Sequence, residues 1–88
     1  MGKHEKLLRR VLSGVADADI RFSDPCGLLE RFGFEERTRG SHHVFRRAGI
    51  EEKVNLQKDG NKAKPYQVRQ VRRVILRHRL GGDLDGQD

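Results

Sequence analysis

The stretch with the clearest chemical capacity is residues 39–47, which read RGSHHVFRR, a glycine turn that leads into a short strand. Neighbouring side chains of a strand point to opposite faces, so His42 and His43 cannot serve one site. Phe45 is the largest apolar residue here, which predicts that it faces the core together with His43. His42 is then left on the open face, where an imidazole can move a proton beside a phosphate. A hairpin tip with two solvated histidines would show the same residues.

The residues around His42 favour chemistry on a phosphate. Ser41 is placed to hydrogen-bond a phosphate oxygen or to orient the imidazole, although serine is also an ordinary turn residue. Gly40 permits the turn that leads into the strand. Basic side chains that could bind phosphates and stabilise developing negative charge follow along the chain. They are Arg39, Arg46, Arg47, Lys62, Lys64, Arg69, Arg72 and Arg73.

The residues for a metal site are lacking. Cys26 is the single cysteine, so there is neither a disulfide framework nor a cysteine cluster for zinc, and we interpret Cys26 as a packing residue in a reducing compartment. No Asp/Glu pair is placed to hold Mg²⁺ beside the histidines. A reaction on a phosphate at this motif is therefore expected to proceed without a metal ion, with His42 as the general acid or base.

The net charge of +6 is unevenly distributed. Residues 1–38 hold seven Lys/Arg and seven Asp/Glu, whereas residues 39–79 hold twelve Lys/Arg and three acids. The remaining acids, Asp83, Asp85 and Asp88, follow with no base among them. A basic surplus confined to one stretch favours a polyanion as partner, most simply a nucleic acid. A solvated basic face without a partner is the alternative.

Length and periodicity predict one α+β domain over residues 1–88. Apolar spacing predicts helices over residues 3–13 and 65–79, and a helix over 24–32 with Asp24 as cap and Pro25 at its first position. Three strands are expected over residues 34–39, 42–47 and 52–57, with a polar loop over 58–64. No apolar run is long enough to span a membrane and no secretory pattern follows Met1, which favours the cytoplasm.

The order helix, three antiparallel strands, helix, with Gly40-Ser41-His42-His43-Val44-Phe45 opening the second strand, resembles the HicA toxin family. These are small bacterial ribonucleases of type II toxin–antitoxin systems. The resemblance covers residues 23–80, leaves residues 3–22 as an N-terminal extension, and leaves 81–88 as an acidic tail that we expect to be disordered.

The resemblance implies a fold like the double-stranded-RNA-binding domain: a three-stranded antiparallel sheet with helices on one face, here with an extra N-terminal helix. It also implies His42 as the catalytic residue, mRNA as substrate, and a HicB-type antitoxin as the partner that covers the site. The 2′-hydroxyl of RNA is then the nucleophile, and from the residues themselves we expect no cofactor and no membrane. Many family members have Pro-His after the third strand, where this chain has Gln57-Lys58. A mechanism with two histidines is therefore not expected.

Two other classes of function fit the same sequence. A non-catalytic RNA-binding module would keep the fold and the basic residues without using His42. An interaction subunit would turn its basic face to an acidic protein. Cleavage of a long transcript in the presence of EDTA separates the nuclease from both.

Overall fold

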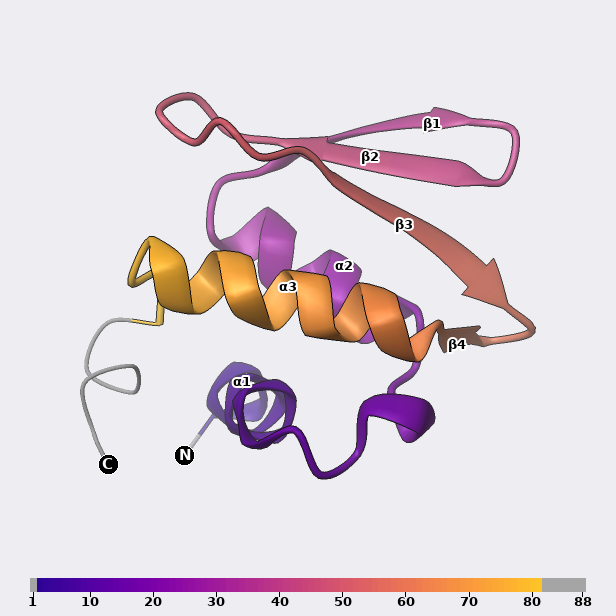
Figure 1. Ribbon diagram of the computed structural model, residues 1–88, viewed down its shortest axis with the longest axis vertical. Helices are drawn as coiled ribbons and strands as arrows, with labels where there is room; N and C mark the ends of the chain where they lie inside the picture. Colours follow the sequence, from indigo (N-terminus) through magenta and orange to yellow (C-terminus); the bar gives the residue numbers. More distant parts are fainter. Residues whose placement is uncertain (1, 82–88) are drawn as a thin grey trace.

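The computed structural model describes residues 2–81, which form an antiparallel sheet covered by helices on one face (Figure 1). The elements are α1 (Lys3–Ser13), a short 3₁₀ helix η1 (Asp17–Asp19), α2 (Ser23–Arg31), β1 (Glu35–Arg39), β2 (His42–Arg46), β3 (Val54–Asp59), β4 (Lys62–Ala63) and α3 (Pro65–Arg77). The predicted α+β class is confirmed, and the arrangement is consistent with a fold like the double-stranded-RNA-binding domain. Of the acidic tail that we expected to be disordered, residues 82–88 lie outside the described residues.

The sheet has four strands in the order β1-β2-β3-β4, not the three that the sequence predicts. The additional strand β4 pairs Lys62 with Asp59 across a tight turn, and a bridge joins Lys62 to Arg21. The amide of Ala63 also donates to the carbonyl of Ile20 (2.9 Å). A strand of two residues has no periodicity of its own, so its pairing with β3 and these contacts with residues 20 and 21 define it.

The start of α2 also differs from the prediction. The helix begins at Ser23 with Phe22 as its N-cap residue, so Asp24 is inside the first turn and Pro25 is the third helical residue. The first four amides of a helix have no carbonyl partner within it, so a proline at this position removes no hydrogen bond. Burial of the Phe22 side chain, 5% exposed, accompanies the earlier start.

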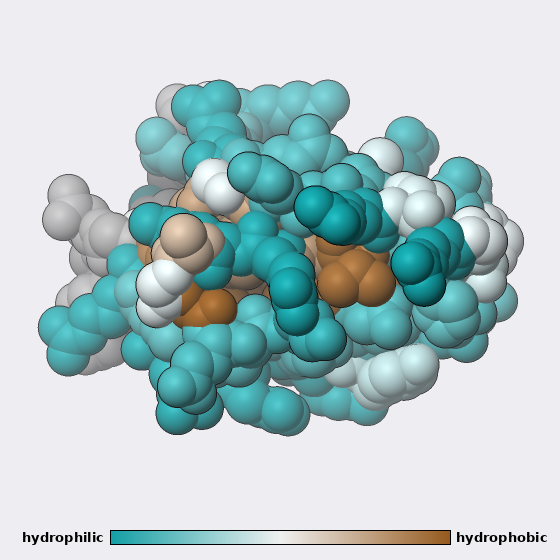
Figure 2. Space-filling model, turned by 90° about the horizontal axis from the view of Figure 1, so that it is seen from above, coloured by the Kyte–Doolittle hydropathy of each residue, from teal (hydrophilic) through white to brown (hydrophobic). Residues whose placement is uncertain are grey.

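The hydrophobic core lies between the helix-facing side of the sheet and α2 and α3. Phe45, Val54 and Leu56 point down from the sheet, and Val68, Val71 and Ile75 point up from α3. Each of these side chains is fully buried, which contributes about 1.5–3 kcal/mol per large side chain. The opposite face of the sheet is open, and it is hydrophilic over most of its area (Figure 2). One face of the sheet is therefore buried in the core, and the other face is open to solvent and to a ligand.

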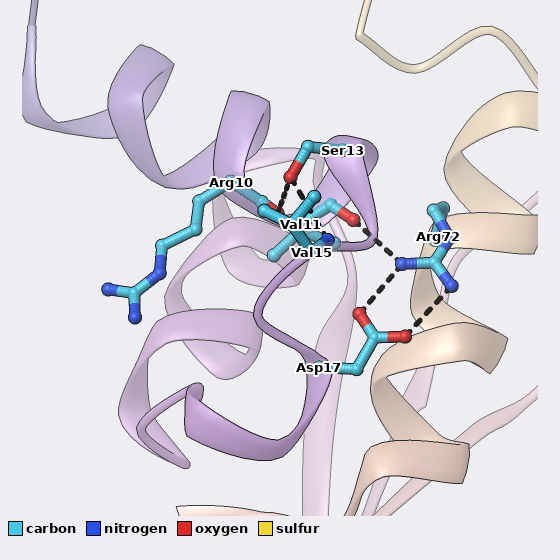
Figure 3. A network of polar contacts seen from close by, with 6 residues as sticks. All are labelled: Arg10, Val11, Ser13, Val15, Asp17 and Arg72. Carbon is cyan, nitrogen blue, oxygen red and sulfur yellow. Dashed lines mark hydrogen bonds and ion pairs between the residues drawn. The ribbon is translucent and has the colours of Figure 1, made fainter.

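The N-terminal helix α1 lies beyond α2 and α3, on the side away from the sheet (Figure 1). Arg72 of α3 fastens this segment (Figure 3): its guanidinium donates to both carboxylate oxygens of Asp17, at 2.8 and 3.0 Å, and to the carbonyl of Val11 at 3.0 Å. These hydrogen bonds from Arg72 lower the pKa of Asp17 below its usual value, and Asp17 raises the pKa of Arg72. Charge pairing as well as burial of Leu8 and Val11 thus holds α1 in place.

Replacing Asp17 with Asn is expected to destabilise the protein by about 2 kcal/mol at pH 7, because Arg72 loses a charged acceptor. For a domain of this size that corresponds to a fall in Tm of about 8–16 °C. Since the native pKa of Asp17 is lowered, its contribution is present above the ordinary carboxyl pKa and is lost as the pH falls through the native value. The Tm difference between wild type and variant should therefore shrink as the solution is acidified.

Circular dichroism melts of both proteins between pH 7 and pH 2 measure this difference. Asp19→Asn is the matched control, because Asp19 pairs with Arg10 and Lys62 but its side chain is 67% exposed. Exposed ion pairs contribute little, so the control should melt close to wild type. Equal Tm values for wild type and Asp17→Asn at pH 7 would show that the pair adds nothing to stability.

Candidate functional site on the open face of the sheet

The open face of the sheet carries side chains from β1, β2 and the region of β3. Antiparallel partners point to the same face, so the register Arg39–His42–Gln57 defines one row across the sheet and Arg37–Val44–Asn55 defines the next. Glu35 and Arg46 are paired beyond the second row. These rows place the predicted catalytic histidine on one surface with several cations.

His42 is the first residue of β2 and is exposed. It follows a two-residue turn between the paired residues Arg39 and His42, in which Gly40 has a φ of 57°. Glycine adopts this backbone conformation without steric cost, and glycine at the first turn position is typical of tight hairpins. Because Phe45 is fully buried on the other face, alternation along β2 directs His42 to solvent, as the sequence predicts.

A chain of hydrogen bonds lies next to His42. Gln57, the cross-strand partner of His42, donates through Nε2 to the Ser41 hydroxyl (3.2 Å) and accepts at Oε1 from the Lys64 ammonium (3.3 Å). The backbone amide of Gln57 donates to Oε1 of Gln67 (2.8 Å), a side chain that is only 4% exposed. Gln57 is thus fixed at backbone and side chain, and it links the Ser41 hydroxyl to the Lys64 ammonium.

His43 has a different environment from its neighbour. It lies on the helix-facing side, where its ring packs edge-on against Phe22 with the ring centroids 4.8 Å apart. Its Nδ1 pairs with the Glu36 carboxylate and lies 3.4 Å from the Thr38 hydroxyl. The two adjacent histidines therefore have separate surroundings, one solvent-facing and one engaged within the fold.

A shallow depression of about 540 Å³ lies on the open face around Val44. Four cations line it, and we call them the basic cradle: Arg37, Arg39, Arg46 and Lys53. Glu35 is the acid in the lining, yet within residues 2–81 none of the four cations forms an ion pair. Figure 2 looks onto this side of the molecule and shows small hydrophobic areas exposed between hydrophilic side chains.

The predicted phosphate-binding residues do not form a single patch. Arg39 and Arg46 belong to the basic cradle, and Arg47 is exposed just beyond β2. The others lie in β4, just after it, or on α3: Lys62 is bound to Asp19 (2.8 Å), Lys64 is bound to Gln57, Arg69 and Arg73 are exposed on α3, and Arg72 is bound to Asp17 and only 19% exposed. Arg72 is therefore engaged within the protein.

Three residues of this face were not among the predicted site residues: Arg37, Lys53 and Gln57. Alternation could have identified Arg37, which is two positions from Arg39 on the same strand. The same rule places Lys53 and Gln57 on the polar side of the third strand. Their association with His42 depends on strand register, which the sequence does not specify by itself.

Two further groups with chemical potential are committed elsewhere. Cys26 is buried, and this burial raises the pKa of its thiol to about 12, so it is not a ready nucleophile. His78 caps the end of α3 and its Nε2 lies 2.9 Å from the Glu52 carboxylate, whose pKa it lowers by hydrogen bonding. Cys26 thus serves packing, as predicted, and His78 lies at the C-terminal end of its helix.

Comparison with known proteins gives a family match. A family model described as the HicA toxin of bacterial toxin–antitoxin matches residues 22–81, the stretch from the start of α2 to the end of the described chain. No curated protein and no solved structure matches the chain. None of the helices within residues 2–81 has the length and hydropathy of a membrane span. Since the match covers well over half of its length, the chain belongs to the HicA toxin family, the toxin component of bacterial toxin–antitoxin systems.

Proposed function

We propose that this toxin is a metal-independent endoribonuclease that cleaves mRNA, with His42 as its single general acid/base. The observation that supports it most directly is the exposed imidazole of His42 on a surface that also carries unpaired cations. An open-face histidine beside bound phosphates has the components for proton transfer at RNA. Membership of a toxin family supplies the biological context in which such a reaction stops growth.

The reaction needs no external nucleophile. His42 accepts the proton of a ribose 2′-hydroxyl, and the oxygen attacks the adjacent phosphorus. The bond from phosphorus to the 5′-oxygen breaks, and this oxygen takes a proton from water as it leaves. The products are a 2′,3′-cyclic phosphate and a 5′-hydroxyl, with the proton on His42 returned to solvent. General base catalysis of this kind contributes about 10²–10⁴-fold.

Ser41, Gln57 and Lys64 assist His42 in this proposal. The Lys64 ammonium has three donors and gives one to Gln57, so the others are available to the negative oxygens of the transition state. The Ser41 hydroxyl accepts from Gln57 and keeps its own proton for a phosphate oxygen. Gly40 sets the turn that places Ser41 and His42 at the entry to β2.

The distribution of metal ligands supports a metal-free route. Across residues 2–81 there is no group of three His, Cys, Asp or Glu side chains that could hold a metal ion. The charge on the phosphate is then met by lysine and arginine, which are plentiful on this face. We accordingly propose no cofactor.

Family membership gives the protein an antitoxin partner, and we propose a HicB-type antitoxin that covers His42. A toxin that acts on mRNA and is restrained by a co-produced protein works in the cytoplasm. Co-expression with the product of the neighbouring gene should restore growth and give a complex on a sizing column. Failure of both would contradict this regulation.

Cleavage is expected to persist when metals are removed. Purified protein incubated with a long transcript in excess EDTA should cut at the same rate as without EDTA, since the proposed reaction uses the RNA's own 2′-hydroxyl. The fragments should end in a 2′,3′-cyclic phosphate, which mass spectrometry identifies directly. A transcript with 2′-O-methyl groups should not be cut.

Two results would redirect the assignment. Loss of cutting in EDTA, with recovery on adding Mg²⁺, would contradict the metal-free route. Retention of RNA without any cutting would identify the chain as a non-catalytic RNA-binding module instead.

A further inference from the structure

We propose that single-stranded RNA lies along β2 across the depression around Val44, with its phosphates held by the basic cradle and the cleaved bond at His42. This path rests on the proposed nuclease function for the chemistry at His42. The position of the RNA, however, follows from the charge and shape of the sheet face. It adds Arg37 and Lys53 to the residues that contact substrate.

The first argument is the charge of the basic cradle. Some cations elsewhere pair with acids, as Arg72 does with Asp17 and Lys62 with Asp19, and others such as Arg69 and Arg73 are exposed singly on α3. The depression differs because it gathers four cations on one lining. In the depression four cations face a single acid, Glu35, and within residues 2–81 none is paired. Like charges held together without counter-charges repel one another. A polyanion relieves this repulsion and gains from the release of its counterions.

The second argument is the geometry of the sheet. Arg37 and Arg39 are two residues apart on β1, which separates their Cα atoms by roughly 6.6 Å. Arg37 is opposite Val44, and Arg46 is four residues from His42 along β2, roughly 13 Å. Cations therefore flank β2 along its length, and His42 lies at the N-terminal end of this strand. A backbone lying along β2 meets the cradle and then the imidazole.

The third argument concerns the kind of polyanion. Val44 is the apolar residue of the lining, and no aromatic side chain contributes to it. Without a stacking surface the bases are not read, so affinity comes from the phosphates. Protein interfaces usually have an apolar or aromatic centre, which one valine does not provide, so the depression fits RNA better than an acidic protein. A single strand is required because regular A-form geometry keeps the 2′-oxygen out of line with the leaving 5′-oxygen.

Binding of a fluorescein-labelled 15-nucleotide oligo(U) to His42→Ala protein tests the path without interference from cleavage. The test variant adds Arg37→Ala and Lys53→Ala, and the charge-matched control adds Arg69→Ala and Arg73→Ala on α3. Anisotropy titrations at several salt concentrations give the affinity and its salt slope. Each lost phosphate contact should reduce the slope by about 0.7, so the cradle variant should lose about 1.4 and bind roughly 10–30-fold more weakly at 0.1 M salt. The α3 control should lose less affinity and show a smaller change in salt slope.

The proposal is overturned if the cradle variant binds like its parent, or if the α3 control loses more affinity, while all three proteins melt at the same temperature. It is also overturned if duplex RNA binds more tightly than oligo(U), or if oligo(A) and oligo(U) differ by more than about tenfold, which would require base readout. A poly-glutamate peptide that displaces RNA at equal charge would assign the depression to an acidic protein. Cradle-dependent binding by a wild-type protein that fails to cut RNA would support the path and contradict only the nuclease function.

Discussion

His42→Ala should abolish RNA cleavage and growth arrest while leaving the fold intact. The proposed base is worth about 10²–10⁴-fold in rate, which is enough to remove toxicity. The side chain is exposed and points away from the core, so its loss should cost at most about 0.5 kcal/mol of stability, a Tm change of about 2–4 °C. Single-turnover cleavage of one defined RNA, together with a thermal melt, measures both effects.

His43→Ala is the matched control, because it removes the same side chain from the adjacent position. His43 packs against Phe22 and pairs with Glu36, so its loss should lower the Tm more than the rate of the chemical step. If folded His42→Ala protein cuts at the wild-type rate, the catalytic assignment is wrong. If the two variants lose activity in parallel with their stability, neither histidine has a specific chemical role.

Phe45→Ala should have the largest effect on stability. Phe45 is 0% exposed at the centre of the sheet's inner face, and removing such a ring costs about 3–5 kcal/mol through lost burial and the cavity left behind. Domains of this size are stable by about 5–15 kcal/mol in total, so this variant should lose a large fraction of the free energy of unfolding. Urea titration followed by circular dichroism measures the change.

Val44→Ala provides the comparison on the same strand. Val44 is the next residue but lies on the open face in the depression, so its truncation should change stability by less than about 1 kcal/mol. A similar loss for both variants would show that the two faces of β2 are not distinct, and would remove the basis for placing His42 in solvent.

The regular elements were predictable from local pattern. Pro65 marks the start of α3, and Val68 and Val71 with their helical spacing define its buried side, which the structure confirms. The strand β4 was not predictable, because two residues show no periodicity and only the pairing with β3 and the contacts with residues 20–22 define it. The start of α2 was misplaced since proline is tolerated anywhere in a first helical turn, so Pro25 does not mark one position.

In the candidate site, too, local sequence pattern predicted some features, whereas others depend on contacts between residues far apart in sequence. Alternation around Phe45 was enough to place His42 on the open face and His43 against the helices. The role of Arg72 could not be predicted, because its partner Asp17 is 55 residues away in sequence and a helical wheel shows only that Arg72 is on a polar side. Gln57 likewise gains significance only through cross-strand contact with His42 and Ser41.

The attachment of the N-terminal segment to α3 has a consequence for synthesis on the ribosome. Arg72 reaches back 55 residues to Asp17 and 61 residues to Val11, and strand β4 reaches back to residues 20–22. Contacts this distant in sequence form only when both segments are available. α1 can pack against α2 early, but the link from Asp17 and Val11 to Arg72 must wait until α3 has left the exit tunnel. During synthesis these contacts therefore form late, after α3 has become available to the segment that precedes it.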